Sequence, residues 1–246
     1  YNSIGAQGAE RLAAALAQNA TITTLHLAWN GIGARGAMRL AAAFEWNSTV
    51  TTLHLDGNYI GVQGAEPLAV ALEQNAPVTA LHLAYNGIGS QGAARLAAAV
   101  EQNATLTTLD LACNDVDSQG AERLASALEQ NTTITTLDLA GNNIGAQGAE
   151  RLAAALDQNT SVTTLRLDGT GIPAQDAEQI AAALERNRAG VRVLTVWCSP
   201  RGSESCSITC TGMGGSQVVC LDMGLQDTVA ALGTAISAQV EHEGHW

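Results

Sequence analysis

The chain has 246 residues, of which 46% are hydrophobic, and it carries a formal net charge of −12 at pH 7. Its eleven basic residues are all arginine, too few in an acidic chain to form the basic clusters that bind nucleic acid or anionic membranes. No apolar run is long enough for membrane insertion, and an odd number of cysteines, five, does not fit a disulfide framework. We therefore expect a cytoplasmic protein that binds neither nucleic acid nor membrane.

A repeat of 28 residues runs through most of the chain. The stretch IGAQGAERLAAAL occurs unchanged at 4–16 and 144–156, and every period between these copies holds a variant of it. Such self-similarity predicts a stack of units, none of which buries its apolar face alone. The chain opens at Tyr1, inside a unit, and we read it as a trimmed or mature part of a longer protein.

Two asparagines recur with the period. The first recurs at Asn2, Asn30, Asn58, Asn86, Asn114 and Asn142, with Thr170 in the seventh place. The second recurs at Asn19, Asn47, Asn75, Asn103, Asn131, Asn159 and Asn187.

Each unit reads as a helix followed by a short strand. In the first unit the apolar residues of 9–16 follow the i, i+3, i+4, i+7 spacing of one helical face. Asn19 follows the last apolar turn, and we expect it to end the helix in the left-handed conformation that asparagine tolerates. The residues after it, 22–27, alternate between apolar and polar in the manner of a strand. Strand, helix and strand in the same sense predict a curved parallel sheet inside and helices outside.

The recurring LxLxxN motif, first seen at Leu25, Leu27 and Asn30, with IGxxGAxxLAxAL after it, resembles the ribonuclease-inhibitor-type leucine-rich repeat over about residues 1–198. The resemblance implies an α/β leucine-rich-repeat solenoid of about seven units, with the leucines in the core and the asparagines in a buried ladder. It also implies protein binding on the inner surface. Thr170, Pro173 and one extra residue before VRVLTVW depart from the pattern, which is typical of the end of an array.

Function is expected where the units differ. Between the two leucines of each strand stands a residue that points out of the concave face, and these residues vary while the rest of the unit is nearly constant. Aromatic residues and two further aspartates flank this column. The predicted partner-binding residues are His26, Trp29, His54, Asp56, His82, Tyr85, Asp110, Asp138, Arg166 and Asp168.

A metal site is the alternative interpretation of the three histidines, because stacked imidazoles can hold zinc. Structural zinc sites usually draw their ligands from several directions, so a solvated ladder kept by repeat duplication is the favoured interpretation. Cys206, Cys210, Cys220 and His242 offer a second zinc set, but small buried cysteines are the commoner meaning. We predict neither metal nor cofactor.

The 28-residue period stops after Cys198. Residues 199–205 are expected to form a linker, and 206–246 two strands around a turn at 212–215, then a helix from Asp227. This segment resembles the first half of a ubiquitin-like β-grasp domain. The later strands and the Gly-Gly tail are absent, so conjugation is not expected. We expect this segment to pack on the last unit or to be completed by another chain.

The sequence contains no nucleophile elbow, phosphate loop or HExxH motif. We therefore predict a non-catalytic protein-binding scaffold, which could serve as a subunit of a larger assembly. The alternative, implied by branches of the resembled family, is a regulator that activates a small GTPase, or an immune-sensor module.

Overall fold

The computed structural model describes residues 2–74, 77–190, 195–200, 205–211 and 217–224. The helices are α1 (Gly5–Leu16), α2 (Gly33–Ala43), α3 (Gly61–Glu73), α4 (Gly89–Gln102), α5 (Ser118–Gln130), α6 (Gly145–Gln158) and α7 (Ala174–Gly190). The strands between them are β1 (Thr24–His26), β2 (Thr52–His54), β3 (Ala80–His82), β4 (Thr108–Asp110), β5 (Thr136–Asp138) and β6 (Thr164–Arg166). They are followed by β7 (Thr195–Pro200), β8 (Ser205–Thr211) and β9 (Gln217–Gly224).

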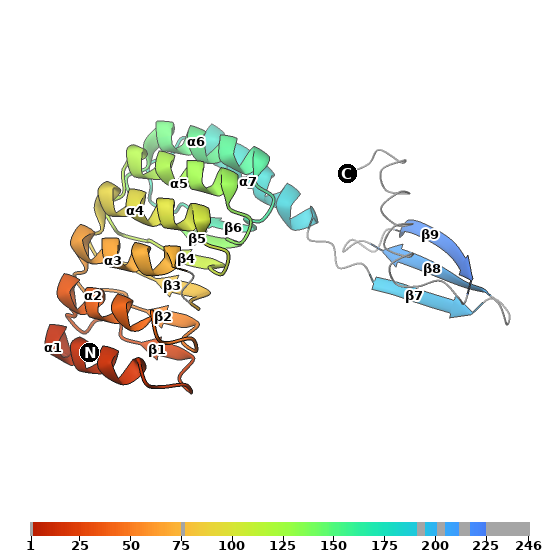
Figure 1. The fold of residues 1–246 in the computed structure, drawn as a ribbon. Helices are drawn as coiled ribbons and strands as arrows, with labels where there is room; N and C mark the ends of the chain where they lie inside the picture. Colours follow the sequence, from red (N-terminus) through yellow and green to blue (C-terminus); the bar gives the residue numbers. More distant parts are fainter. Residues whose placement is uncertain (1, 75–76, 191–194, 201–204, 212–216, 225–246) are drawn as a thin grey trace. The chain divides into compact units, whose positions relative to one another are not determined.

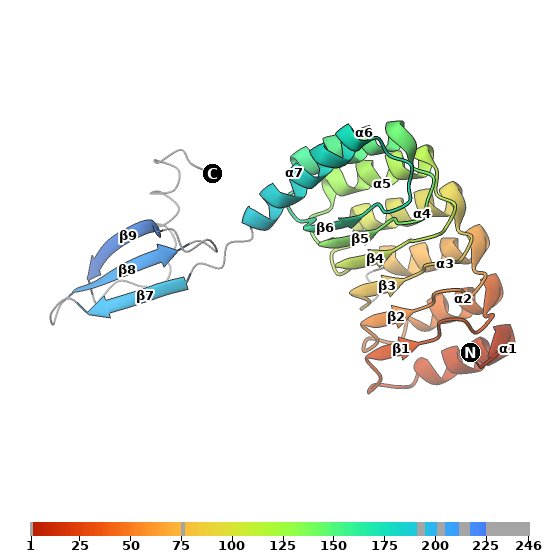
Figure 2. The same cartoon turned by 180° about the vertical axis from the view of Figure 1, so that it is seen from behind.

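The first compact unit, Tyr1–Asn187, is an α/β solenoid, as predicted. Strands β1 to β6 form one parallel sheet in chain order, and each residue pairs with its counterpart in the next repeat, as Leu25 does with Leu53. The helices lie along the outer side of this sheet, and the strands line the inner side of the curve (Figures 1 and 2). The strict period of the sequence therefore fixes the register of the sheet.

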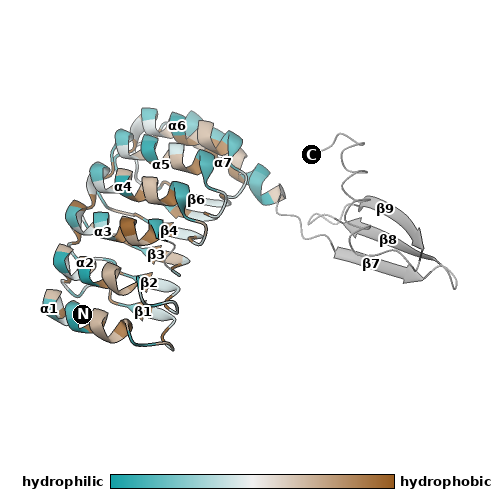
Figure 3. Ribbon diagram, viewed as in Figure 1, coloured by the Kyte–Doolittle hydropathy of each residue, from teal (hydrophilic) through white to brown (hydrophobic). Residues whose placement is uncertain are grey.

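The core lies between the strands and the helices. The two leucines of each strand point into it, and Leu53 and Leu55 are 1% and 0% exposed. Each helix contributes alanines and leucines from one face, so polar and apolar segments alternate along the helices in Figure 3. Alanine at these positions lets the helices approach one another closely, because it has little side chain to separate them.

The first asparagine column forms a buried ladder, as the resemblance implies. Asn58 donates through Nδ2 to the carbonyl oxygens of Leu55 in its own unit and Leu27 in the preceding unit, both at 2.8 Å. Its Oδ1 accepts from the backbone N–H groups of Asn30 (3.0 Å) and Ile32 (3.3 Å). One amide thus satisfies backbone groups of two units that water cannot reach.

The second asparagine column works differently from the prediction. The sequence predicts a left-handed residue that ends the helix, but Asn131 has φ −81° and ψ 133°, which is extended. Its Oδ1 accepts from the N–H groups of Thr133 and Ile134, while Nδ2 donates to Val100 and Asn103 carbonyls of the preceding unit. The left-handed expectation is wrong because an extended backbone lets this side chain start the strand and bind the neighbouring unit together.

The C-terminal part differs from the predicted boundaries. Residues 192–194, where the period would place a seventh parallel strand, lie outside the described residues. The sequence predicts residues 195–198 as part of the array and 199–200 as part of the linker. Instead, they form strand β7, which pairs antiparallel with β8. With the extra residue before VRVLTVW, Leu194 and Val196 stand in the places of Leu165 and Leu167, so the residue pattern alone does not distinguish another parallel strand from the antiparallel β7.

The two predicted strands of the tail are present. Strands β8 and β9 pair antiparallel, and β7 adds a third strand that the sequence analysis did not assign to the tail. The turn at 212–215 and the helix expected from Asp227 lie outside the described residues. The second unit is Arg188–Trp246.

The asparagine ladder yields a stability prediction. In an Asn114→Ala variant, the buried N–H groups of Asn86 and Ile88 lose their partner, and the Leu83 carbonyl loses one of its two bonds, which should lower the free energy of unfolding by about 3 kcal/mol or more. Asn30→Ala is the matched control, because Asn30 accepts a bond from Asn2 but donates only within its own unit. Denaturant unfolding should show a distinctly smaller loss for Asn30→Ala. Equal losses would contradict the inter-unit role of the ladder.

Candidate functional site

The predicted concave column is one continuous row. His26, His54, His82, Asp110, Asp138 and Arg166 stand at paired positions of six neighbouring parallel strands. Because parallel strands in register place equivalent side chains on the same face, the row runs along the inner side of the array. We call these six residues the concave column.

The three histidines stack face to face. The ring centroids of His26 and His54 lie 4.3 Å apart at an interplanar angle of 14°, and those of His54 and His82 lie 4.2 Å apart at 12°. Rings stacked in this way do not direct three nitrogen atoms at one point, as tetrahedral zinc requires. In the described parts of the chain, no group of three or more histidine, cysteine, aspartate or glutamate side chains is arranged to hold a metal ion.

The stack ends in an acid–base pair. His82 Nδ1 lies 3.6 Å from Asp110 Oδ2. The hydrogen bond to Asp110 raises the pKa of His82, whereas burial and then the charges of His82 and His26 lower the pKa of His54. Burial favours a higher pKa for Asp110, but the bonds from His82 and the Ala112 N–H outweigh it, so that the pKa of Asp110 is lowered. Neighbouring histidines of one stack therefore titrate in different ranges.

The C-terminal half of the column is less acidic than its composition indicates. Arg166 lies between two carboxylates, with Nη1 3.3 Å from Asp138 Oδ2 and Nε 3.8 Å from Asp168 Oδ2. Asp138 Oδ1 also accepts the Ala140 N–H at 3.0 Å. These aspartates are thus partly neutralised within the protein.

A second column beside the first has an unusual backbone. Its members all have a positive φ, and they are Trp29 (58°), Gly57 (62°), Tyr85 (56°), Cys113 (53°), Gly141 (67°) and Gly169 (69°). The Trp29 ring lies directly over Gly57, where an added Cβ would come within 2.3 Å of a ring carbon. The ring centroids of Trp29 and Tyr85 are 5.6 Å apart. The glycine of the intervening unit thus lets the two predicted aromatic residues meet.

Tyr59 was missed by the sequence analysis. It is 80% exposed and has a φ of 58°. The corresponding residues of the neighbouring units, Gly31 and Gly87, also have positive φ but are glycine. The sequence therefore carries a signal for this residue, because a tyrosine stands where the neighbouring units have glycine.

The structure thus brings together the predicted residues in three groups. His26, His54 and His82 stack, and Trp29 meets Tyr85; Asp110 joins the histidines, and Asp138, Arg166 and Asp168 form a separate ionic cluster. Asp56 lies beside the stack, where its Oδ1 accepts the Ala84 N–H at 3.1 Å.

Comparisons with known proteins agree with this architecture. Residues 86–206 match the family model described as the TMOD/LMOD leucine-rich domain, and 18–41, 47–69 and 74–97 match a leucine-rich-repeat model. Among solved structures, the chain is similar to leiomodin-1 actin-binding site 2, with 21% identity over 73% of this chain and 87% of that one, at a TM-score of 0.46. The Caenorhabditis elegans tropomodulin C-terminal domain shows 14% identity over 74% of this chain and 95% of that one, at a TM-score of 0.50.

No curated protein gives a sequence match. The repeat matches and the parallel sheet together identify a leucine-rich-repeat protein with an α/β solenoid fold. Within the described segments, no helix has both the length and the apolar character needed to cross a membrane.

The histidine stack yields a pH prediction. Histidine NMR titrations should place the pKa of His82 above 6.5 and that of His54 below it. The contribution of the raised His82 pKa to stability is fully present below about 6.5 and is lost as pH rises through the folded value. The contribution of Asp110, whose pKa is lowered, is present above about 3.9 and is lost as pH falls through its folded value. In an Asp110→Asn variant the His82 pKa should fall, and an unchanged value would refute the pairing.

Proposed function

We propose that this leucine-rich-repeat protein is a non-catalytic scaffold that binds a partner protein on its concave face. The supporting observation is the placement of exposed aromatic residues in the left-handed backbone positions beside the concave column. Trp29 and Tyr85 are 42% and 55% exposed there.

The fold alone gives no reason for these aromatic residues. A non-glycine residue in the left-handed region costs about 1 kcal/mol, and glycine occupies the same place in other units, as at Gly57 and Gly141. Only 3% of the chain is aromatic, so their concentration on one edge is informative. Aromatic side chains provide much of the binding energy at protein interfaces, which supplies the reason that stability does not.

The proposed interface includes the histidine stack and extends along the column. The stacked imidazoles, Trp29 and Tyr85 form an aromatic half, and the Asp138–Arg166–Asp168 cluster forms a polar half. Protonation of the stack under mild acid makes the aromatic half more positive. A partner that presents carboxylates to this half therefore gains affinity at lower pH.

The GTPase-activating alternative has less support. It needs an arginine that reaches a bound nucleotide, and Arg166 is the arginine of the concave column. Its guanidinium lies between Asp138 and Asp168, so presentation to a nucleotide would first require those contacts to break.

Further assignments belong to the same proposal. We assign the repeats to the ribonuclease-inhibitor type because each full unit combines a helix with a short strand in one 28-residue period. A free thiol at Cys113 supports a cytoplasmic location, since reducing compartments keep thiols unpaired. The ubiquitin-like comparison of the tail rests on the β8–β9 hairpin alone.

The test is a pair of variants that separate binding from stability. Partners recovered with the intact chain are identified by mass spectrometry, and actin is included as a purified candidate, because the similar leiomodin-1 structure is an actin-binding site. Trp29→Gly and Tyr85→Gly should each weaken binding of the identified partner at least tenfold in calorimetry. The free energy of unfolding of each variant, measured by thermal melting, should stay within about 1 kcal/mol of that of the parent, because glycine suits the positive φ.

Two controls complete this test. Glu122→Ala on the outer face should leave the affinity unchanged. Gly57→Ala and Gly87→Ala both strain a positive φ, but only the former collides with the Trp29 ring, whereas nothing lies within 4 Å of a Cβ at Gly87. Gly57→Ala should therefore weaken binding more. If Glu122→Ala abolishes binding and the aromatic variants do not, the concave-face proposal is wrong.

A further inference from the structure

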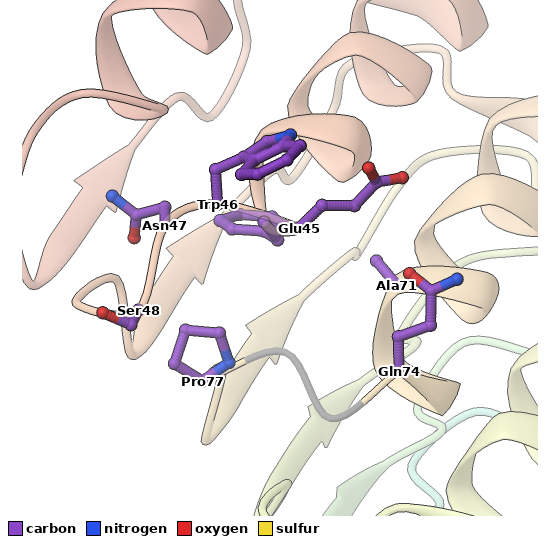
Figure 4. Close-up of a pocket in the computed structure, with 8 residues that line it drawn as sticks. Glu45, Trp46, Asn47, Ser48, Ala71, Gln74 and Pro77 are labelled. Atoms are coloured by element: carbon purple, nitrogen blue, oxygen red, sulfur yellow. The ribbon is translucent and has the colours of Figure 1, made fainter.

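A groove on the outer face lies between α2 and α3. One part of it is a cavity of about 350 Å³ whose lining includes Met38, Pro67 and Val70. It adjoins a cavity of about 580 Å³ at the C-terminal ends of these helices, whose lining includes Trp46 and Pro77 (Figure 4). Glu45, Ala71 and Gln74 line both cavities, so the two form one continuous groove.

The residues of this groove depart from the repeat. Met38 stands where units one, three and five have glutamate, and Trp46 stands where most units have glutamine. Pro67 replaces an arginine that recurs at Arg11, Arg39, Arg95, Arg123 and Arg151. Val70 replaces alanine or serine, and Pro77 replaces threonine or serine. All five changes fall in two neighbouring units, and each replaces the usual residue by one that is more apolar or bulkier.

Packing of the solenoid does not require these residues. Met38 is 48% exposed, Val70 38% and Trp46 75%. Pro67 lies inside α3, where it cannot donate the helical hydrogen bond to the carbonyl of Gln63, another residue that lines the groove. Exposed apolar side chains gather here although one of them, Pro67, weakens the helix that carries it. Such a patch marks a surface for an interaction.

The charges around the groove are one-sided. Glu45 and Glu66 line it, and none of the described residues in its lining is basic. Arg39 pairs with Glu10 at 3.4 Å, and Arg95 pairs with Glu66 and Glu73 at 3.8 Å. Glu66 is therefore partly neutralised, and Glu45 is the lining carboxylate that enters none of the ion pairs of the described residues. With Pro67 in place of the recurring arginine, the groove combines an apolar floor with an acidic rim.

We propose that this groove binds an amphipathic helix of another protein, with an apolar face toward Met38 and Val70 and basic residues beside Glu45 and Glu66. Two neighbouring parallel helices leave a furrow into which the side-chain ridges of a third helix fit. From Gln63 to Gln74, α3 spans roughly 16 Å, enough for about three helical turns. The site lies on the helical layer and is separate from the concave face.

Electrostatics decides between the possible occupants. A second copy of this chain would bring a further charge of −12 to an acidic rim. A helix with basic flanks instead gains charge complementarity with the carboxylates that line the groove.

The experiment uses the whole chain and designed helical peptides as probes. One peptide has a leucine face flanked by arginines, a second has the same face flanked by glutamates, and a third has the first composition in scrambled order. Calorimetry measures affinity, and the tryptophan emission of the parent, compared with that of a Trp46→Phe variant, reports on occupancy of the groove. The arginine peptide should bind with a blue shift in emission, and the other two at least tenfold more weakly.

The matched variant restores the repeat pattern. The matched triple variant combines Met38→Glu, Pro67→Arg and Val70→Ala. Other units already accommodate these residues, so its melting temperature should equal or exceed that of the parent. This variant should bind the arginine peptide at least tenfold more weakly, whereas Glu122→Ala on α5 should bind it as the parent does.

Three results would overturn the proposal. The first is unchanged binding by the triple variant. The second is equal binding of the arginine and glutamate peptides, which would show that the groove does not select basic residues. The third is a dimer of the parent and a monomer of the triple variant in light scattering, which would mean that a second copy of the chain occupies the groove. Because the concave proposal is tested through Trp29 and Tyr85, either proposal can fail alone.

Discussion

The solenoid depends on one interaction, the buried side-chain amide that satisfies backbone groups of two units at once. Asn58 and its equivalents are almost fully buried, and each supplies donors and acceptors that neither water nor the short strands provide. Strands of three residues make few ladder hydrogen bonds of their own. The amides therefore hold the turns after the strands together, and the leucines pack between these turns and the helices.

The period allows most of the array to be predicted because identical units must pack identically. Leucine spacing gives the inward positions, and the fixed offset of 28 residues gives the pairing of His54 with His82. Local propensity was a poorer guide at Asn131, where bonds to a neighbouring unit override the left-handed preference. Residue type alone does not reveal such bonds. Beyond Asn187 the period no longer constrains the chain, and the predicted boundaries of the array and linker differ from the observed strands.

The candidate site was only partly accessible to sequence. Alternation and the spacing of parallel strands predict the concave column and the stacking of its histidines, but not the pairing of His82 with Asp110 or the engagement of Arg166 by two aspartates. These depend on side-chain rotamers and on neighbours one unit away. Tyr59 and Met38 are missed for a different reason: they lie in the turn and on the helix, outside the alternating strand residues, and are found by comparing equivalent positions of the units.

A repeat protein offers its own control for separating stability from function. At each position the other units show which residue the fold accepts, so an exposed residue that is less favourable than its counterparts calls for another explanation. Trp29 and Tyr85 satisfy this criterion through their backbone, and Pro67 through its missing donor. All three lie in the first three units, Trp29 and Tyr85 beside the concave column and Pro67 on the helical side. The concave column faces the inner side of the curve and the exposed helix side chains face the outer side, so each face can change without disturbing the leucines and asparagines between them. The same units can therefore present two unrelated surfaces, and the duplicated residues between them keep the frame constant.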